Sequence, residues 1–408
     1  MVVNSVFIVM LAPIHSLSAS QQGSGRVIWG LPSLLSAATQ DGAFIPVIRS
    51  NSNSRLLVIY NQVTEQGVEN PYYRESLDGG KSWHEASPVQ VSDDELLQAT
   101  FDFDQAGEAH AIWRTQTEIW HSAESQWPYA SNLITATDGL VFNPDISVGE
   151  NGTLHVVWAQ EDNRIYYAQS VDGGNSWQGE TALTWGLNKS DQPAVAADEA
   201  GNVHVVWEER VFDPDLIAFR YEIRYLMGIS ETLGLSWSSS SALLSGDVVN
   251  AQQPDIIARD GHVDVAFARR DRIDDVNQEH YAYYVSYSPA LGWSEPRDVT
   301  HDPVIVNSNV PFVLVPELVT CDEVVYLYYH GAPADNSKEI ILGANSSDNW
   351  ERRDQVDVGS ARAIRPSAIC LAGKLHLVYE KVIRPNVDHQ IYYISGNRYA
   401  AFIPVAHR

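Results

Sequence analysis

The chain has 408 residues and a formal net charge of −26 at pH 7, from 52 acidic and 26 basic side chains. Nucleic-acid binding needs a basic face, so this charge balance argues against a nucleic-acid partner. Hydrophobic residues make up 44% of the chain, which is enough for a large core. The 12 Trp and 19 Tyr, with only three Met, favour strands over helices. No long segment has helical periodicity, so the sequence predicts an all-β fold.

The chain begins with a short apolar run at residues 6–14, followed by the small residues Ser18-Ala-Ser20. This pattern is typical of a signal peptide, although no Lys or Arg precedes the run; a mis-assigned start or an ordinary leader is the alternative. We interpret residues 1–20 as a signal peptide and expect a secreted or extracytoplasmic protein. No other segment approaches the roughly 18 continuous apolar residues needed to span a membrane.

A unit of about 50 residues then recurs, as propeller blades do. It starts near residues 45, 97, 144, 193, 254, 316 and 366, in most copies at a proline. Its most regular part is an apolar second strand that ends in an aromatic residue: Leu57–Tyr60, Ala109–Trp113, Leu154–Trp158, Val203–Trp207, Val263–Phe267, Val325–Tyr329 and Leu375–Tyr379. Four strands in each unit predict a seven-bladed β-propeller, formed as a single domain by residues 26–408.

The two ends of the chain indicate how the ring closes. The seventh unit ends at Ile391–Ile394 and lacks the strand that carries a Trp in the other units. A matching segment, Val27–Ser36, lies near the N-terminus. We therefore predict that the N-terminal strand completes the last blade. The alternative is closure by the tail, Tyr399–Val405.

One turn motif occurs twice almost unchanged, as Ser76-Leu-Asp-Gly-Gly-Lys-Ser-Trp83 and as Ser170-Val-Asp-Gly-Gly-Asn-Ser-Trp177. Asp and Ser side chains can bond to the amides of such a turn, and glycine supplies positive φ. Later copies, at Ser230–Trp237 and Ser286–Trp293, retain only part of the motif. Because the turn varies while the strands around it persist, we expect it to serve folding rather than chemistry.

The motif resembles the Asp-box, or BNR repeat, of the sialidase-like propellers. In that family the boxes join the third and fourth strands, on the face opposite the active site. The resemblance therefore implies structural roles for Ser76, Asp78, Gly80, Trp83, Ser170, Asp172, Gly174 and Trp177. Sialidases have six blades and a Phe/Tyr-Arg-Ile-Pro motif, whereas this chain has Phe44 in place of the arginine of that motif. The resemblance is thus to exported bacterial BNR-repeat proteins of undefined activity.

Propeller geometry places the residues that follow the second strands, or precede the first strands, on the face opposite the boxes. Those that we select as candidate ligand-binding residues are Arg114, Glu208, Glu209, Arg210, Arg269, Arg270, His330, Arg365 and Glu380. Arginines can clamp the carboxylate of an acidic sugar, and paired carboxylates can serve glycoside hydrolysis. The alternative is that these charges neutralise one another in ion pairs between blades.

We expect this face to bind a glycan or another extracellular ligand, such as a protein. The alternatives are a sialidase-like glycoside hydrolase or a polysaccharide lyase acting on acidic sugars, and a purely structural interaction module. We expect a monomer without cofactor or metal. The histidines 110, 155, 204 and 376 share one repeat position, which favours packing over metal binding. Cys321 and Cys370 occupy similar places in neighbouring units, and either a disulfide or two free thiols is compatible with this.

Overall fold

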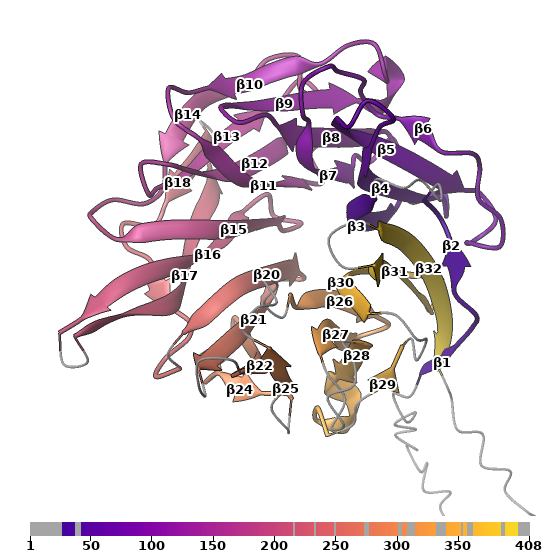
Figure 1. Cartoon of the computed structure of the whole chain (residues 1–408). Helices are drawn as coiled ribbons and strands as arrows, with labels where there is room; N and C mark the ends of the chain where they lie inside the picture. The colour runs from indigo at the N-terminus through magenta and orange to yellow at the C-terminus, as the bar shows by residue number, and fades with distance from the viewer. Residues whose placement is uncertain are drawn as a thin grey trace, which may run out of the picture.

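The fold is a ring of seven antiparallel sheets around a central axis (Figure 1). The computed structural model describes residues 27–36, 42–214, 217–231, 234–248, 250–272, 277–300, 304–307, 315–331, 340–351, 354–356, 362–384 and 388–398. Each sheet is one blade, and its first strand lies nearest the axis. The predicted all-β, seven-bladed propeller is confirmed.

The blades follow one another in chain order. Blade 1 contains β3 (Ala43–Ser50), β4 (Leu56–Val63), β5 (Glu69–Ser76) and β6 (Ser87–Pro88). Blade 2 contains β7 (Leu97–Phe103), β8 (Ala109–Arg114), β9 (Glu118–Ala123), the 3-10 turn η1 (Glu124–Gln126) and β10 (Asn132–Ala136). Blade 3 contains β11 (Val141–Val148), β12 (Leu154–Gln160), β13 (Ile165–Ser170) and β14 (Gln178–Ala182).

The later blades have longer or more divided strands. Blade 4 contains β15 (Lys189–Ala197), β16 (Val203–Asp213), β17 (Ala218–Glu231), β18 (Gly234–Trp237) and β19 (Ala242–Leu243). Blade 5 contains β20 (Ala251–Arg259), β21 (His262–Arg272), β22 (Asn277–Ser288), β23 (Gly292–Trp293), β24 (Arg297–Asp298) and β25 (Val304–Asn307). Blade 6 contains β26 (Glu317–Cys321), β27 (Val324–Gly331), β28 (Ile340–Asn345), the 3-10 turn η2 (Ser346–Asp348) and β29 (Asp354–Gln355). Blade 7 contains β30 (Arg362–Leu371), β31 (Lys374–Arg384) and β32 (Asp388–Arg398).

The N-terminal segment closes the ring, as predicted. Strands β1 (Val27–Trp29) and β2 (Ser33–Leu34) both pair antiparallel with β32. The backbone N–H of Val27 also donates to a carboxylate oxygen of Asp354 in blade 6, at 3.3 Å. Both the signal-peptide segment and the alternative closing tail, Tyr399–Val405, lie outside the described residues. Among the described residues, no helix is long and apolar enough to cross a membrane.

The core consists of layers between neighbouring blades. The second strand of each blade is apolar on both sides because both of its faces pack against other blades; Leu56–Tyr60, for example, are all completely buried. A tryptophan of every blade then contacts an aromatic ring of the preceding blade, with ring centroids 4.6–5.7 Å apart. The pairs are Trp83–Tyr393, Trp127–Tyr73, Trp177–His121, Trp237–Tyr167, Trp293–Tyr225, Trp350–Tyr284 and Trp29–Tyr328.

The two complete turn motifs connect the third and fourth strands of blades 1 and 3. In the first, Asp78 accepts the backbone N–H groups of Lys81 and Ser82, each at 2.9 Å, and the Ser82 hydroxyl at 2.6 Å. In the second motif, Asp172 accepts the backbone N–H of Ser176 at 2.9 Å and its hydroxyl at 2.6 Å, and these hydrogen bonds lower the pKa of Asp172 to about 2. Both carboxylates are therefore engaged within their own turns.

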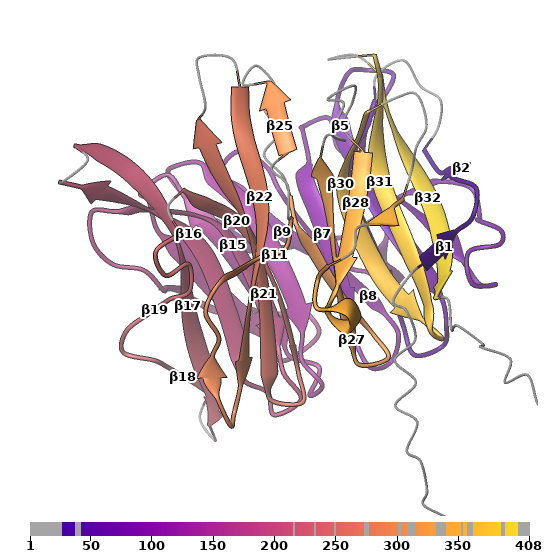
Figure 2. The same cartoon turned by 90° about the horizontal axis from the view of Figure 1, so that it is seen from below.

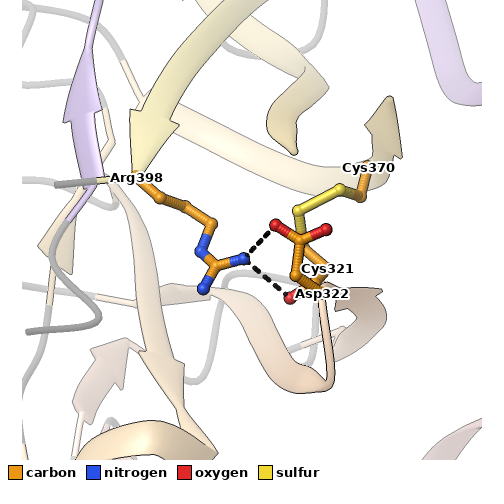
Figure 3. Close-up of a disulfide and its surroundings, with 4 residues drawn as sticks. All are labelled: Cys321, Asp322, Cys370 and Arg398. Carbon is orange, nitrogen blue, oxygen red and sulfur yellow. Dashed lines mark hydrogen bonds and ion pairs between the residues drawn. A yellow bond between two sulfur atoms is a disulfide. The ribbon is translucent and has the colours of Figure 1, made fainter. Parts of the chain in front are cut away.

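A disulfide joins the inner strands of blades 6 and 7. Cys321 ends β26 and is bonded to Cys370 of β30, 49 residues later (Figure 3). The guanidinium of Arg398, at the end of β32, donates to the carbonyl of Cys321 at 3.1 Å and to Asp322 at 2.5 Å. Of the two possibilities for these cysteines, the structure contains the disulfide. Together these bonds fasten blade 7, which holds the ring closure, to blade 6.

We expect the substitution Cys370→Ser to lower the melting temperature of the protein. Cross-links of this kind constrain the unfolded chain and contribute about 2–4 kcal/mol to stability. Thermal unfolding followed by circular dichroism is the measurement. The double variant Cys321→Ser/Cys370→Ser should lose as much as the single one, and a reducing agent should shift only the wild type. An unchanged melting temperature in both variants would contradict the prediction.

Candidate functional site

A cavity of about 390 Å³ lies on the axis and is lined by residues from the first strand, or the residues just before it, of all seven blades. The start of each first strand pairs with the end of the second, as Asp191 does with Glu208. The mouth of this cavity therefore lies on the face that carries the hairpins between second and third strands. The turn motifs at residues 76–83 and 170–177 lie on the other face.

The mouth is shaped by an unusual backbone conformation that recurs in six blades. Each of these first strands has one residue with φ of 49–53°, at a break in the pairing with the second strand. The next residue is proline in five cases, and proline disfavours the right-handed helical region for the residue before it. A left-handed non-glycine residue costs about 1–3 kcal/mol, and such residues cluster at functional sites. They are Ile45, Gln98, Asn143, Gln192, Gln253 and Arg365.

Four of these six residues carry side-chain amides, which can both donate and accept hydrogen bonds. Gln98 donates to the side-chain oxygen of Asn143 at 2.8 Å, and Asn143 donates to Asp191 at 2.9 Å. The other two amides have no such links among the described residues. The Oε1 atom of Gln253 is buried without a hydrogen-bond partner, and the side chain of Gln192 lines the cavity. The mouth thus offers polar groups suited to sugar hydroxyls.

A charged sector lies beside the mouth where blades 7, 1 and 2 meet. Burial raises the pKa of Glu69, at the start of β5, to about 7, and the nearby Glu95 adds to this shift. The positive charges of Arg114 and Arg365 act on Glu69 in the opposite direction. Arg114 donates to Gln98 at 2.5 Å, which ties this sector to the amides of the mouth. The charges of two of the arginines expected from the sequence therefore act on one carboxyl group.

Glu69 was not among the residues expected from the sequence. The expected residues follow second strands or precede first strands, whereas Glu69 begins a third strand. It nevertheless lies on the same hairpin and pairs with Val63 at the end of β4. The start of a third strand therefore belongs to the same face as the end of the second, and this position is the sequence signal for Glu69.

Two of the expected carboxylates link neighbouring blades. The side chain of Glu380 is fully buried and accepts hydrogen bonds from the backbone N–H of Ile45 at 3.3 Å and from Arg365 at 2.9 Å. Burial alone would raise the pKa of Glu380, but the hydrogen bond from His389 and the charge of Arg365 hold it below its usual value. Glu208 does the equivalent between blades 4 and 5, because it accepts the N–H of Gln253 at 3.0 Å. Burial raises the pKa of Glu208 to about 7.

The remaining expected residues lie in other parts of the ring. Glu209 accepts from Asn188 at 2.7 Å, and Arg269 pairs with Asp271 at 2.5 Å. The charge of Arg270 acts on Glu208, and His330 is buried in β27. Arg210 stacks on Phe219, with its guanidinium 3.9 Å from the ring centroid. The nine residues therefore do not form one cluster: Arg114, Arg365 and Glu380 share the sector described above, while Glu209 and Arg269 are paired within their own region of the ring.

Deeper along the axis, one arginine faces four carboxylates. A second cavity of about 300 Å³ shares Arg49, Asp255 and Glu317 with the first. Arg49 lies 3.8 Å from Glu317, and its charge also acts on Asp102 and Asp145. Each carboxylate accepts a backbone N–H of the next blade; their partners are Val148, Val195, Leu318 and Ala368. These carboxylates connect the inner strands of neighbouring blades through hydrogen bonds, although their negative charges repel one another.

One group of potential metal ligands occurs among the described residues: Asp104, Glu108 and His110, whose ligand atoms lie within 4.8 Å of one another. Blade 4 contains the same aspartate–histidine contact, between Asp198 and His204 at 3.3 Å, with Asn202 in place of the glutamate. The contact is thus a feature of the repeated hairpin and does not require a metal.

The axial carboxylates predict a specific dependence of stability on pH. Burial raises the pKa of Asp145 to about 6 in the folded protein, against about 3.9 in an unfolded chain. The folded state therefore binds the proton of the Asp145 carboxyl more tightly than the unfolded chain does. The contribution of protonated Asp145 to the free energy of unfolding is lost as the pH rises from 4 through 6. Asn mimics the protonated side chain and retains an oxygen for the N–H of Val195.

We accordingly expect Asp145→Asn to be more stable than the wild type at pH 8, by about 1–3 kcal/mol, and the gain to vanish near pH 4. Urea unfolding at pH 4, 6 and 8 is the measurement. The matched control is Asp138→Asn, which changes an exposed aspartate. A gain that is equal at pH 4 and pH 8 would show that the charge of Asp145 is not the cause.

No protein-family model and no curated protein matches this chain. Several solved structures have a similar fold. A protein of unknown function from Dyadobacter fermentans has a TM-score of 0.55 and 12% identity, over 92% of this chain and all of that chain. An ulvan lyase of polysaccharide lyase family PL25, bound to -[GlcA(1-4)Rha3S]-, has a TM-score of 0.63 and 10% identity, over 88% and 95% of the two chains. A Trypanosoma rangeli sialidase has a TM-score of 0.44 and 10% identity, over 88% and 55%.

At these identities the likeness defines the fold. The chain is a seven-bladed propeller whose fold is similar to that of the ulvan lyase and of the Dyadobacter protein.

Proposed function

We propose that the protein binds a glycan containing acidic sugars at the mouth of the axial cavity. The observation that carries this proposal is the composition of the mouth: the amides of Gln192 and Gln253, which have no side-chain hydrogen bond to another described residue, line the same cavity as Arg365 of the charged sector. Amides bond to sugar hydroxyls, and guanidinium groups bind carboxylates in a planar, two-pronged manner. The cavity volume of about 390 Å³ falls in the range of ordinary ligand sites, about 300–1,000 Å³.

The fold supports the same ligand class. The ulvan lyase of similar fold was solved with a glucuronate- and sulfate-containing glycan. A polyanionic ligand must overcome a net charge of −26 on the protein, so local arginines have to outweigh the long-range repulsion. A disulfide in the structure favours an oxidising compartment. We therefore propose an extracytoplasmic, monomeric glycan-binding protein.

The test is binding of oligosaccharides with the GlcA(1-4)Rha3S repeat, measured by isothermal titration calorimetry. We expect Gln192→Ala to weaken binding by about tenfold, since it removes hydrogen bonds to the ligand worth roughly 1–1.5 kcal/mol. Gln178→Ala, an exposed glutamine of β14, is the matched control and should bind like the wild type. Equal affinity for the oligosaccharide and for a neutral glycan, or no effect of Gln192→Ala, would contradict the proposal. Capture of a protein ligand in place of a glycan would do so as well.

A second candidate function is elimination at an acidic sugar, favoured by the position of Glu69. Its carboxylate would take the proton from C5 of a uronate while Arg365 neutralises the sugar carboxylate. The C4–O bond then breaks, the electron pair leaves on the oxygen, and that oxygen takes a proton from water, which gives an unsaturated uronate and a new chain end with a free hydroxyl. A base with a pKa of about 7 is well matched to this step at neutral pH.

For this candidate we expect ultraviolet absorbance from unsaturated uronate to rise when the polysaccharide is added. The rate should increase as the pH passes through 7, because only ionised Glu69 accepts the proton. Glu69→Gln should abolish turnover, whereas oligosaccharide binding by the same variant should persist. Turnover that survives Glu69→Gln would exclude Glu69 as the base, and absence of turnover in the wild type would leave binding as the function.

A further inference from the structure

Two neighbouring blades extend beyond the face that carries the cavity mouth. The hairpin β16–β17 of blade 4 and the hairpin β21–β22 of blade 5 have strands of 11 to 14 residues, against six or seven for β8, β9, β12 and β13. Figure 2 shows the β21–β22 hairpin reaching toward the end opposite β18, and the β16–β17 hairpin projecting outward from the side of the ring. Their extensions have no counterpart in blades 2 and 3.

The strand register within each hairpin determines which side chains lie on the same side of that hairpin. Val206 and Ile223 of blade 4 share a core cluster with Phe267 and Tyr283 of blade 5. Because side chains alternate along a strand, the residues two, four and six positions further out point to the same side. These are the cross-strand pairs Arg210–Tyr221, Phe212–Phe219, Arg269–Tyr281 and Asp271–Glu279. We refer to these two sets of outward side chains, one on each hairpin, as the walls of blades 4 and 5.

The wall on blade 4 is aromatic and positively charged. The Phe212 and Phe219 side chains are 50% and 52% exposed, and their rings are 5.4 Å apart. The guanidinium of Arg210 stacks on Phe219, and its Nε is buried without a hydrogen-bond partner among the described residues. Other arginines of this hairpin, such as Arg224, pair with carboxylates. Stacking holds the Arg210 guanidinium in place and leaves its charge available to an anion.

On the blade 5 wall, the charged side chains are paired with partners on the same wall. Arg269 pairs with Asp271 and lies 5.3 Å from the ring of Tyr281, whose hydroxyl donates to Glu279 at 2.8 Å. Of the two described arginines on these walls, Arg210 is therefore the one without a carboxylate partner among the described residues. At their base, Glu208 accepts the N–H of Gln253, which lines the cavity. The inner end of the blade 4 wall is thus hydrogen-bonded to a residue of the cavity mouth.

We infer that the two hairpins form a second subsite, which binds a further acidic residue of the glycan held at the axial mouth. The inference rests on the proposed function. Exposed aromatic rings provide flat apolar surfaces for the carbon-bound hydrogens of a sugar, and exposed apolar patches of this kind mark ligand sites. Arg210 would pair with the sulfate or carboxylate of that sugar. The charge of Arg210 and its continuity with the mouth favour this occupant over an apolar one.

The experiment compares a disaccharide and a hexasaccharide of the GlcA(1-4)Rha3S repeat by calorimetry. In the wild type we expect the hexasaccharide to bind about tenfold more tightly, because it occupies both subsites. Arg210→Ala and Phe219→Ala should each abolish most of that gain and leave the affinity for the disaccharide unchanged. Lys81→Ala, which removes one exposed positive charge on the opposite face, is the control and should behave like the wild type. Melting temperatures establish that each variant is folded.

The outcomes separate the two proposals. Equal affinity of the wild type for both lengths, or a loss in Arg210→Ala that is the same for both, would overturn the second subsite while the axial site stands. A length gain that survives both substitutions would also overturn it, since the added contacts would then lie elsewhere. If the wild type binds neither oligosaccharide, the proposed function fails and the second subsite with it.

Discussion

The contact between a tryptophan and an aromatic ring of the preceding blade is the interaction on which this ring depends. It recurs in all seven blades, and the last pair, Trp29 with Tyr328, uses the N-terminal strand. A single four-stranded blade has two apolar faces and cannot bury either alone. Each blade is therefore stable only between two neighbours, and closure of the ring removes the two exposed faces that an open array would leave.

The same requirement explains why candidate site residues can be misread. An inner strand with a left-handed residue leaves a backbone N–H that its own blade does not satisfy, and buried N–H groups need partners. Glu208 and Glu380 supply that partner from the adjacent blade. In a sequence they are acidic residues at the end of a strand, as a catalytic pair would be. Their burial against a neighbour's backbone indicates an architectural use.

The fold was predictable from the sequence because its signals are local and repeated. The apolar second strands and the Trp after each turn mark the blades, and the missing strand of the last unit indicates the N-terminal closure. The site was less predictable, because it depends on which blades lie close together in space. Burial and the charge of Glu95 raise the pKa of Glu69, against the opposing effect of arginines from blades 2 and 7. No spacing along the chain reports such distances, and the choice between a disulfide and free thiols was open for the same reason.

At the left-handed residues of the mouth, the backbone conformation is independent of the side chain. Six blades present the same backbone conformation there, yet their side chains range from isoleucine through amides to arginine. The repeated backbone conformation is thus set by the strand break and the residue that follows it. The side chain at this position is free to differ between blades. A propeller of this kind can acquire a new ligand through substitution of a few of these side chains, without disturbing the contacts that keep the ring closed.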